Sequence, residues 1–142
     1  MDNGKELISL EIEALPPTVN QMYRNVSIHG ITRRYKTPAC HDFQDALASK
    51  LKFLWGDKPP YTENVSLYVE FSQKDRRRWD IDNRVKALQD CLSMAGVIKD
   101  DSQINFLQVE RHHKADKTST RLTLTAVEQA QHHKNEGEKT NE

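Results

Sequence analysis

The sequence has little cysteine, no excess charge of either sign and no long apolar run. Its 142 residues include 21 basic and 21 acidic side chains, so the formal net charge is zero. This balance argues against attraction of nucleic acid by the whole surface. The two cysteines, Cys40 and Cys91, lie far apart and outside any CxxC spacing. They favour small buried thiols in a reduced setting over a disulfide scaffold.

Signals for membranes and secretion are also missing. No apolar run approaches the roughly 20 residues that a membrane-spanning helix needs, and the N-terminus lacks the core of a signal peptide. We therefore expect a soluble cytoplasmic protein. Hydrophobic residues make up 36% and aromatic residues 7% of the chain, which suits one ordinary domain with a modest core.

The charges are distributed unevenly even though they cancel. Between Met22 and Lys36 there are four basic residues and no acidic one. Between Lys74 and Arg78 there are four bases against the single acid Asp75. Local positive patches on a neutral protein suit a polyanion that binds at one face.

Hydrophobic periodicity predicts one small mixed α+β domain with a mixed β-sheet, two main helices and the order β-α-β-α-β-β. Alternating apolar residues predict strands over residues 6–13, 65–71, 103–110 and 121–127. A helix is predicted from about Pro38 to Gly56, with an apolar stripe of Phe43, Leu47, Leu51 and Leu54. A second helix, capped by Asp82 or Asn83, should run to about Ala95.

Two segments fall outside this pattern. Residues 20–36 carry Asn, Gly and Arg without helical periodicity, which indicates a long loop or an irregular hairpin. Residues 128–142 have no apolar anchor, so we expect a disordered tail after a domain of residues 1–127.

The segment from residue 74 to residue 101 combines arginines with clustered carboxylates. Asp80 and Asp82 are spaced i, i+2, which in extended backbone points both side chains to one side, where they can share a cation. Asp100 and Asp101 follow a helix of about 13 residues, some 20 Å long. They can return to the first pair only if the chain doubles back or another subunit supplies them.

Each of these residues also has an ordinary interpretation. Asp80 and Asp82 can belong to a solvated loop or a helix cap, and Lys86 can pair with Asp82 at i, i+4. The run Arg76–Arg78 binds phosphate or simply balances Asp75. Trp79 stacks on a base or anchors the core, with the core slightly favoured.

Together the motifs resemble the RusA-type family of Holliday junction resolvases. The matching text is LPPTVNQMYR near the start and DRRRWDIDNRVKALQDCLSMAGVIKDDSQI from Asp75. The resemblance implies a homodimer that cuts four-way DNA junctions by paired symmetric nicks in recombination and repair. It also implies a bacterial or phage protein that depends on Mg²⁺, with Mn²⁺ as a substitute.

Site residues follow from the same resemblance. Asp80, Asp82 and Asp101 are expected to be the catalytic, metal-binding carboxylates, with Asp100 ranked below Asp101, and Lys86 is expected to support catalysis. The residues expected to bind DNA are Arg76, Arg77, Arg78, Arg24 and Asn20. The reaction would be phosphodiester hydrolysis by an endodeoxyribonuclease.

Two other functions compete with the nuclease. The first is a non-catalytic module that binds branched or single-stranded DNA and whose acids are structural. The second is a zinc protein built on histidine pairs such as His112-His113 with the cysteines. Adjacent histidines in a strand point to opposite faces, which disfavours zinc.

Overall fold

The computed structural model describes residues 4–113 and 115–127. Its centre is a four-stranded sheet in which β5 lies parallel to β4, while β6 runs antiparallel to both β1 and β4. The order across the sheet is β1 (Glu6–Ile12), β6 (Ser119–Ala126), β4 (Val65–Ser72) and β5 (Ile104–His112). The mixed α+β class predicted from the sequence is confirmed, and the expected tail lies outside the described residues.

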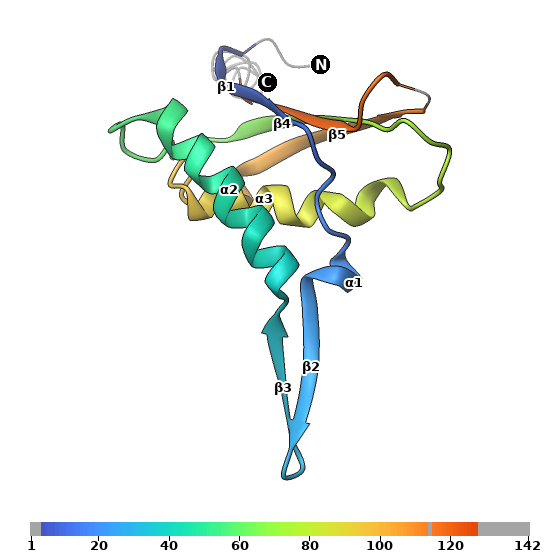
Figure 1. Ribbon diagram of the computed structural model, residues 1–142. Coiled ribbons are helices and arrows are strands. Elements are labelled where there is room, and N and C mark those ends of the chain that lie inside the picture. Colours follow the sequence, from blue (N-terminus) through green and yellow to red (C-terminus); the bar gives the residue numbers. More distant parts are fainter. Residues whose placement is uncertain (1–3, 114, 128–142) are drawn as a thin grey trace, which may run out of the picture.

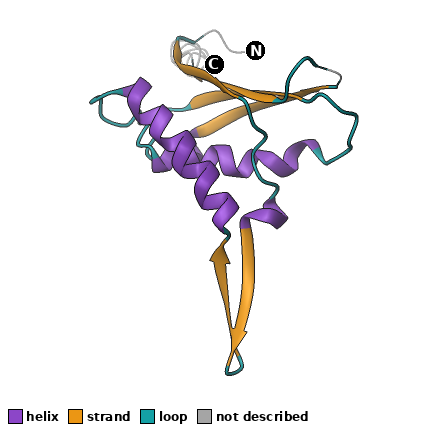
Figure 2. Cartoon of the chain, in the orientation of Figure 1, coloured by secondary structure: helices purple, strands orange, loops and turns teal. Residues whose placement is uncertain are grey.

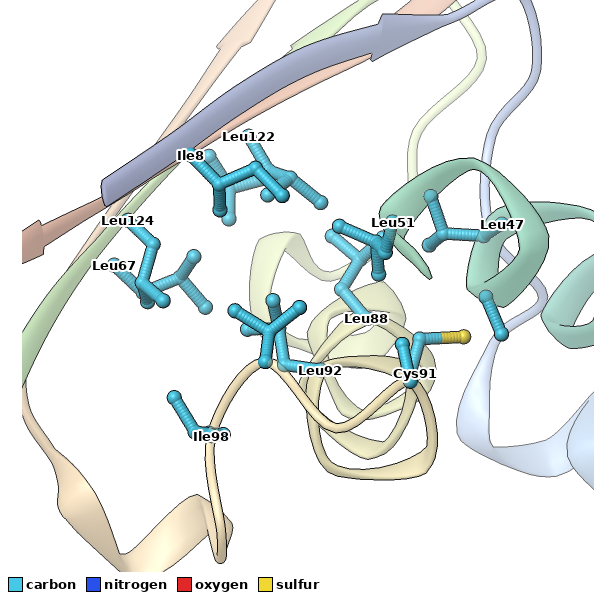
Figure 3. Close-up of a cluster of buried hydrophobic side chains, with 14 of the residues drawn as sticks. Ile8, Leu47, Leu51, Leu67, Leu88, Cys91, Leu92, Ile98, Leu122 and Leu124 are labelled. Carbon is cyan, nitrogen blue, oxygen red and sulfur yellow. The ribbon is translucent and has the colours of Figure 1, made fainter. Parts of the chain in front are cut away.

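Helices cover one face of the sheet (Figure 1; Figure 2). The crossover from β4 to its parallel neighbour β5 passes through α3 (Val85–Met94), and α2 (Pro38–Trp55) packs beside α3. Side chains from the sheet and both helices meet in one core (Figure 3). The contributors drawn there include Ile8, Leu67, Leu122 and Leu124 from strands, Leu47 and Leu51 from α2, and Leu88, Cys91 and Leu92 from α3.

The central strand β4 follows its predicted alternation. Val65, Leu67, Val69 and Phe71 are all at most 1% exposed and face the helices. The residues between them therefore point to the opposite, helix-free face of the sheet. This alternation places Tyr68 and Glu70 on that open face.

Helix α2 begins as predicted but buries a different stripe at its end. The Thr37 hydroxyl accepts a hydrogen bond from the Cys40 amide, and Gly56 with φ 76° ends the helix. Leu54 is 50% exposed, so its predicted place in the core is wrong. Trp55 is buried instead, because it continues the i, i+4 row of Leu47 and Leu51.

The segment before α3 also differs from expectation. A 3-10 turn, η1 (Ile81–Arg84), precedes α3, and Asp80 occupies its N-cap position without a side-chain cap bond. Arg84 stands at the N-cap of α3 itself. The predicted cap by Asp82 or Asn83 is therefore wrong, because both residues lie inside the 3-10 turn.

Residues 23–36 form a regular hairpin where a loop or an irregular hairpin was expected. After the one-turn helix α1 (Val19–Met22), β2 (Tyr23–Ile28) pairs along its full length with β3 (Ile31–Lys36). His29 and Gly30, with φ of 55° and 77°, form the turn. Figure 1 shows this hairpin projecting away from the domain, and the predicted element order omitted α1 and both strands.

Candidate active site

Asp80 and Asp82 lie exposed at the N-terminal end of the η1–α3 unit. The backbone is extended at Asp80, with φ −69° and ψ 129°, but Asp82 is already inside the 3-10 turn. The i, i+2 argument assumed extended backbone at both residues, but only Asp80 is extended. Both carboxylates still flank the start of a helix, where the macrodipole favours negative charge.

Asp100 and Asp101 lie at η2 (Asp101–Gln103), just before β5. The Asp100 carboxylate accepts a hydrogen bond from the Ser102 amide at 2.9 Å. Hydrogen bonding by the Ser102 side chain, and next by its amide, lowers the pKa of Asp100. The Gln103 side chain completes the cap by accepting from the Asp100 amide. Asp100 is thus engaged in capping although it is exposed, and the Asp101 side chain is 39% exposed.

Lys86 connects Asp101 to the side of α3. Its Nζ lies 3.0 Å from an oxygen of Asp90 and 3.8 Å from an oxygen of Asp101. The ion pairs therefore join Lys86 to Asp90, four residues later, and not to Asp82. The hydrogen bond to Asp90 raises the pKa of Lys86, so this side chain stays cationic at neutral pH. Asp90 was missed, although its i, i+4 spacing from Lys86 is visible in the sequence.

The three expected metal ligands are not gathered within one chain. Asp80 and Asp82 precede α3, whereas Asp101 follows it in the sequence and lies 3.8 Å from Nζ of Lys86, the second residue of the helix. Among the described residues, one place brings three metal-binding side chains together, with ligand atoms within 4.8 Å of one another. Asp80, Asp82 and Asp101 are not among them.

That place is the open face of the sheet, at Glu70, Glu110 and His112. Glu70 and Glu110 are register partners on the parallel strands β4 and β5, and His112 lies two residues further along β5. His112 Nε2 is 3.8 Å from Glu70 and 3.5 Å from Glu110, and all three side chains are about half exposed. The cluster could hold a divalent ion. The sequence did not predict this cluster, because neither strand alone specifies the register in which β4 and β5 pair.

The arginine run forms an ordered loop. The buried Gln73 side chain donates to the carbonyl oxygens of Asp75 and Arg77, at 3.2 and 2.8 Å. The Asp75 carboxylate accepts from the Arg77 amide at 3.0 Å. Asp75 therefore shapes the loop, and Arg76, Arg77 and Arg78 are left exposed beside Asp80.

Trp79 is a core anchor, as the sequence slightly favoured. Its ring packs edge-on against Phe71 at 5.3 Å, and its Nε1 donates to Gln73 at 2.8 Å. The guanidinium groups of Arg84 and Arg111 lie 4.8 and 5.0 Å from the ring. These contacts hold the partly buried ring against the core.

The N-terminal motif docks against the start of α3. The Arg84 guanidinium donates to the carbonyl of Pro16, and burial lowers the pKa of Arg84. Met22, Cys40 and Ala87 form a small buried cluster just beyond. Asn20 and Arg24, on either side of Met22, are exposed near this end of α3.

Both cysteines are free and buried, as the sequence suggested. Burial raises the pKa of Cys40, and it raises the pKa of Cys91 to about 12. Neither thiol is therefore suited to act as a nucleophile or metal ligand at neutral pH.

A small α+β domain that sets an exposed arginine loop beside paired aspartates has the features of an enzyme acting on nucleic-acid phosphates. The family model for endodeoxyribonuclease RusA matches residues 14–125, and the chain belongs to that family. This membership supports an endonuclease of the Holliday junction resolvase kind that binds DNA. No match was found among curated proteins. Within the described residues, no helix has the length and apolar character to span a membrane.

Proposed function

We propose that the protein is a metal-dependent, structure-selective endonuclease that resolves four-way DNA junctions by paired symmetric nicks in recombination and repair. The observation that carries the proposal is the RusA family match, which includes both aspartate pairs, Lys86 and the arginine loop. The protein would act on this substrate in the cytoplasm of a bacterium, and its gene would be bacterial or carried by a phage.

Asp80, Asp82 and Asp101 would hold the metal. Carboxylate oxygens are the ligands that Mg²⁺ prefers, so the donor set fits Mg²⁺, with Mn²⁺ as a substitute. When bound, the ion supplies an activated water and neutralises charge on the scissile phosphate. Lys86 is protonated at neutral pH and would stabilise developing negative charge, which excludes a role for it as general base there.

The arginine loop would deliver the DNA backbone. Arg76, Arg77 and Arg78 are exposed, and the hydrogen bonds of Gln73 and Asp75 hold their backbone before any ligand arrives. An ordered loop loses less conformational entropy on binding than a free one. Asn20 and Arg24 would extend this contact beside the start of α3.

A homodimer would complete the metal site. β5 is an edge strand that begins just after Asp101, and its far end contacts η1. Near this end, Arg111 donates to the carbonyl of Trp79, just before Asp80. Antiparallel pairing of two β5 edges about a two-fold axis would bring Asp101 of one chain toward Asp80 and Asp82 of the other. It would also cover the edge residues Phe106 and Leu107, which are 38% and 43% exposed.

One observation favours a second candidate function. Since the three aspartates are not gathered in one chain, a monomeric protein could bind branched or single-stranded DNA without cutting it. In that case Asp80→Asn would change nothing. In a nuclease, Asp80→Asn abolishes cleavage and leaves binding intact or improves it, because a repelling negative charge is removed.

The test incubates the protein with a mobile four-way junction and a matched linear duplex, in Mg²⁺ or in EDTA. We expect paired nicks in the junction only, and only with metal. Equal cutting of both substrates would indicate a general nuclease, and no cutting by a protein that binds junctions would favour the binding module. Glu110→Gln serves as the matched control for Asp80→Asn. If Glu110→Gln abolishes cutting and Asp80→Asn does not, the metal belongs at the open sheet face.

A further inference from the structure

The hairpin of residues 23–36, called here the hairpin arm, has two unlike faces. Directly opposite residues of an antiparallel pair lie on one face, and the register places Ile28 opposite Ile31 and Val26 opposite Arg33. Arg24 and Tyr35 complete this apolar face. The opposite face is polar, and it carries Ser27 opposite Thr32.

The apolar face is open to solvent. Ile28 and Ile31 are each 59% exposed at the tip, and Tyr35 is 49% exposed. A groove of about 260 Å³ runs along this face between Val26, Ile28, His29, Ile31, Arg33 and Tyr35. Isolated two-stranded hairpins are at best marginally stable in water. An arm that also exposes a pair of isoleucines therefore indicates a partner.

The arm is firmly held at its base. The Thr37 amide donates to the Met22 carbonyl at 2.9 Å, and the Thr37 hydroxyl donates to the Gln21 carbonyl at 2.7 Å. Met22 is fully buried against Cys40 and Ala87. Ala87 is the neighbour of Lys86 on α3, so the arm springs from the same end of α3 as the proposed active site. Figure 1 shows the tip far from the rest of the domain.

Two kinds of partner could cover this arm, a second copy of the chain or a polyanion, and the charge of the arm distinguishes between them. Residues 22–36 contain four basic residues and no acid, and Arg24 and Arg33 lie on the apolar face itself. A second copy on this face would bring these guanidinium groups together, which is unfavourable. The second copy is therefore disfavoured, and a polyanion with apolar surface fits better.

The dimensions also suit DNA. Six residues per strand give the arm a length of about 20 Å. The major groove, about 12 Å wide, admits a two-stranded β-ribbon. Apolar side chains can insert between bases at a cost of a few kcal/mol per unstacked step. That cost is smallest where stacking is already interrupted, as at the branch point of a junction.

We propose that the hairpin arm is a wedge that enters the branch point of the DNA, with Ile28 and Ile31 against bases and Arg33 and Arg34 on phosphates. This inference rests on the proposed function for its substrate. It adds a structural reason for choosing branched DNA over duplex, which the metal site and the arginine loop do not provide.

The experiment compares a variant of the apolar face with a control on the polar face, taken from the adjacent cross-strand pair of the hairpin. Ile28→Thr/Ile31→Thr removes the apolar tip but keeps β-branched residues, so the strands should still form. Ser27→Ala/Thr32→Ala is the control. Binding is measured in EDTA by fluorescence anisotropy with a four-way junction and a matched duplex. A 2-aminopurine at the branch point reports unstacking.

We expect the wild type and the control to increase the 2-aminopurine signal. The tip variant should lose that increase and bind the junction about tenfold more weakly, a loss of about 1.4 kcal/mol, with duplex affinity unchanged. Arg33→Gln/Arg34→Gln should weaken binding to both DNAs and flatten the salt dependence, by about 0.9 in slope for each phosphate that is no longer neutralised.

Retention of the signal and of junction preference by the tip variant would overturn the proposal. So would conversion of the tip variant to a smaller oligomer in light scattering, which would assign the arm to contacts between subunits. Because binding is measured without metal, these outcomes are independent of cleavage. A wild type that unstacks the junction but never cuts it in Mg²⁺ would overturn the proposed nuclease and leave the wedge standing.

Discussion

Two variants that are each inactive should regain DNA cleavage when they form a heterodimer, if the metal site is shared between subunits. The variants are Asp80→Asn and Asp101→Asn, each of which removes one proposed ligand without changing side-chain shape. Both residues lie at the surface, with Asp101 partly exposed, so neither change should disturb folding. Each variant alone is expected to bind junctions and not cut them.

The distances within one chain motivate the experiment. Ligand oxygens must lie about 2.0–2.1 Å from a Mg²⁺ ion. Among the described residues of one chain, Asp80, Asp82 and Asp101 do not bring their carboxylate oxygens within 4.8 Å of one another. In a shared site, a heterodimer of the two variants has one site with both wild-type residues and one site lacking both. If the sites were complete within each chain, both sites of the heterodimer would lack a ligand.

The magnitude follows from counting sites. An equal mixture that exchanges subunits freely contains about one half heterodimer, so about one quarter of the wild-type sites should be active. Heterodimers isolated with two affinity tags should have about one half of their sites active. Each heterodimer should nick one strand only, which a junction labelled on each strand in turn will show.

A verified heterodimer that cuts no strand in Mg²⁺ would refute the shared site. Each variant purified alone is the control for residual activity, and light scattering confirms the oligomeric state. Activity of the Asp101→Asn variant by itself would show that this carboxylate is not a required ligand.

Two further predictions concern the core. Because burial raises the pKa of Cys91 from its ordinary 9.0 to about 12, the folded protein should not react at this residue with a thiol reagent at pH 8, and denaturant should release the reaction. Rapid reaction of Cys91 in the folded protein would contradict the raised pKa. Between pH 9 and 12 the folded state keeps a proton that the unfolded state releases, so the free energy of unfolding should fall as pH rises through this range. On α2, Leu51→Ala should cost about 2–5 kcal/mol in urea unfolding because Leu51 is fully buried, whereas Leu54→Ala should change stability by no more than about 0.5 kcal/mol because Leu54 is half exposed. Equal costs would contradict the observed helix face.

Local patterns were enough to predict much of the scaffold. The alternation of Val65, Leu67, Val69 and Phe71 identified β4, and the residues of the RusA-like motif identified the family without any knowledge of the fold. Such signals are local, because the period of hydrophobic residues reports which side of one element is buried. Leu54 shows the limit: an apolar residue near a stripe is not buried unless another element covers it.

The arrangement of the polar groups depended on long-range contacts. Glu70, Glu110 and His112 meet because β5 pairs parallel to β4 in one register, and neither strand specifies that register alone. Asp101 reaches Lys86, the second residue of α3, because the crossover returns along the helix. Periodicity carries no information on how strands pair or how a connection turns back. These relations appear only when the chain has packed around its core.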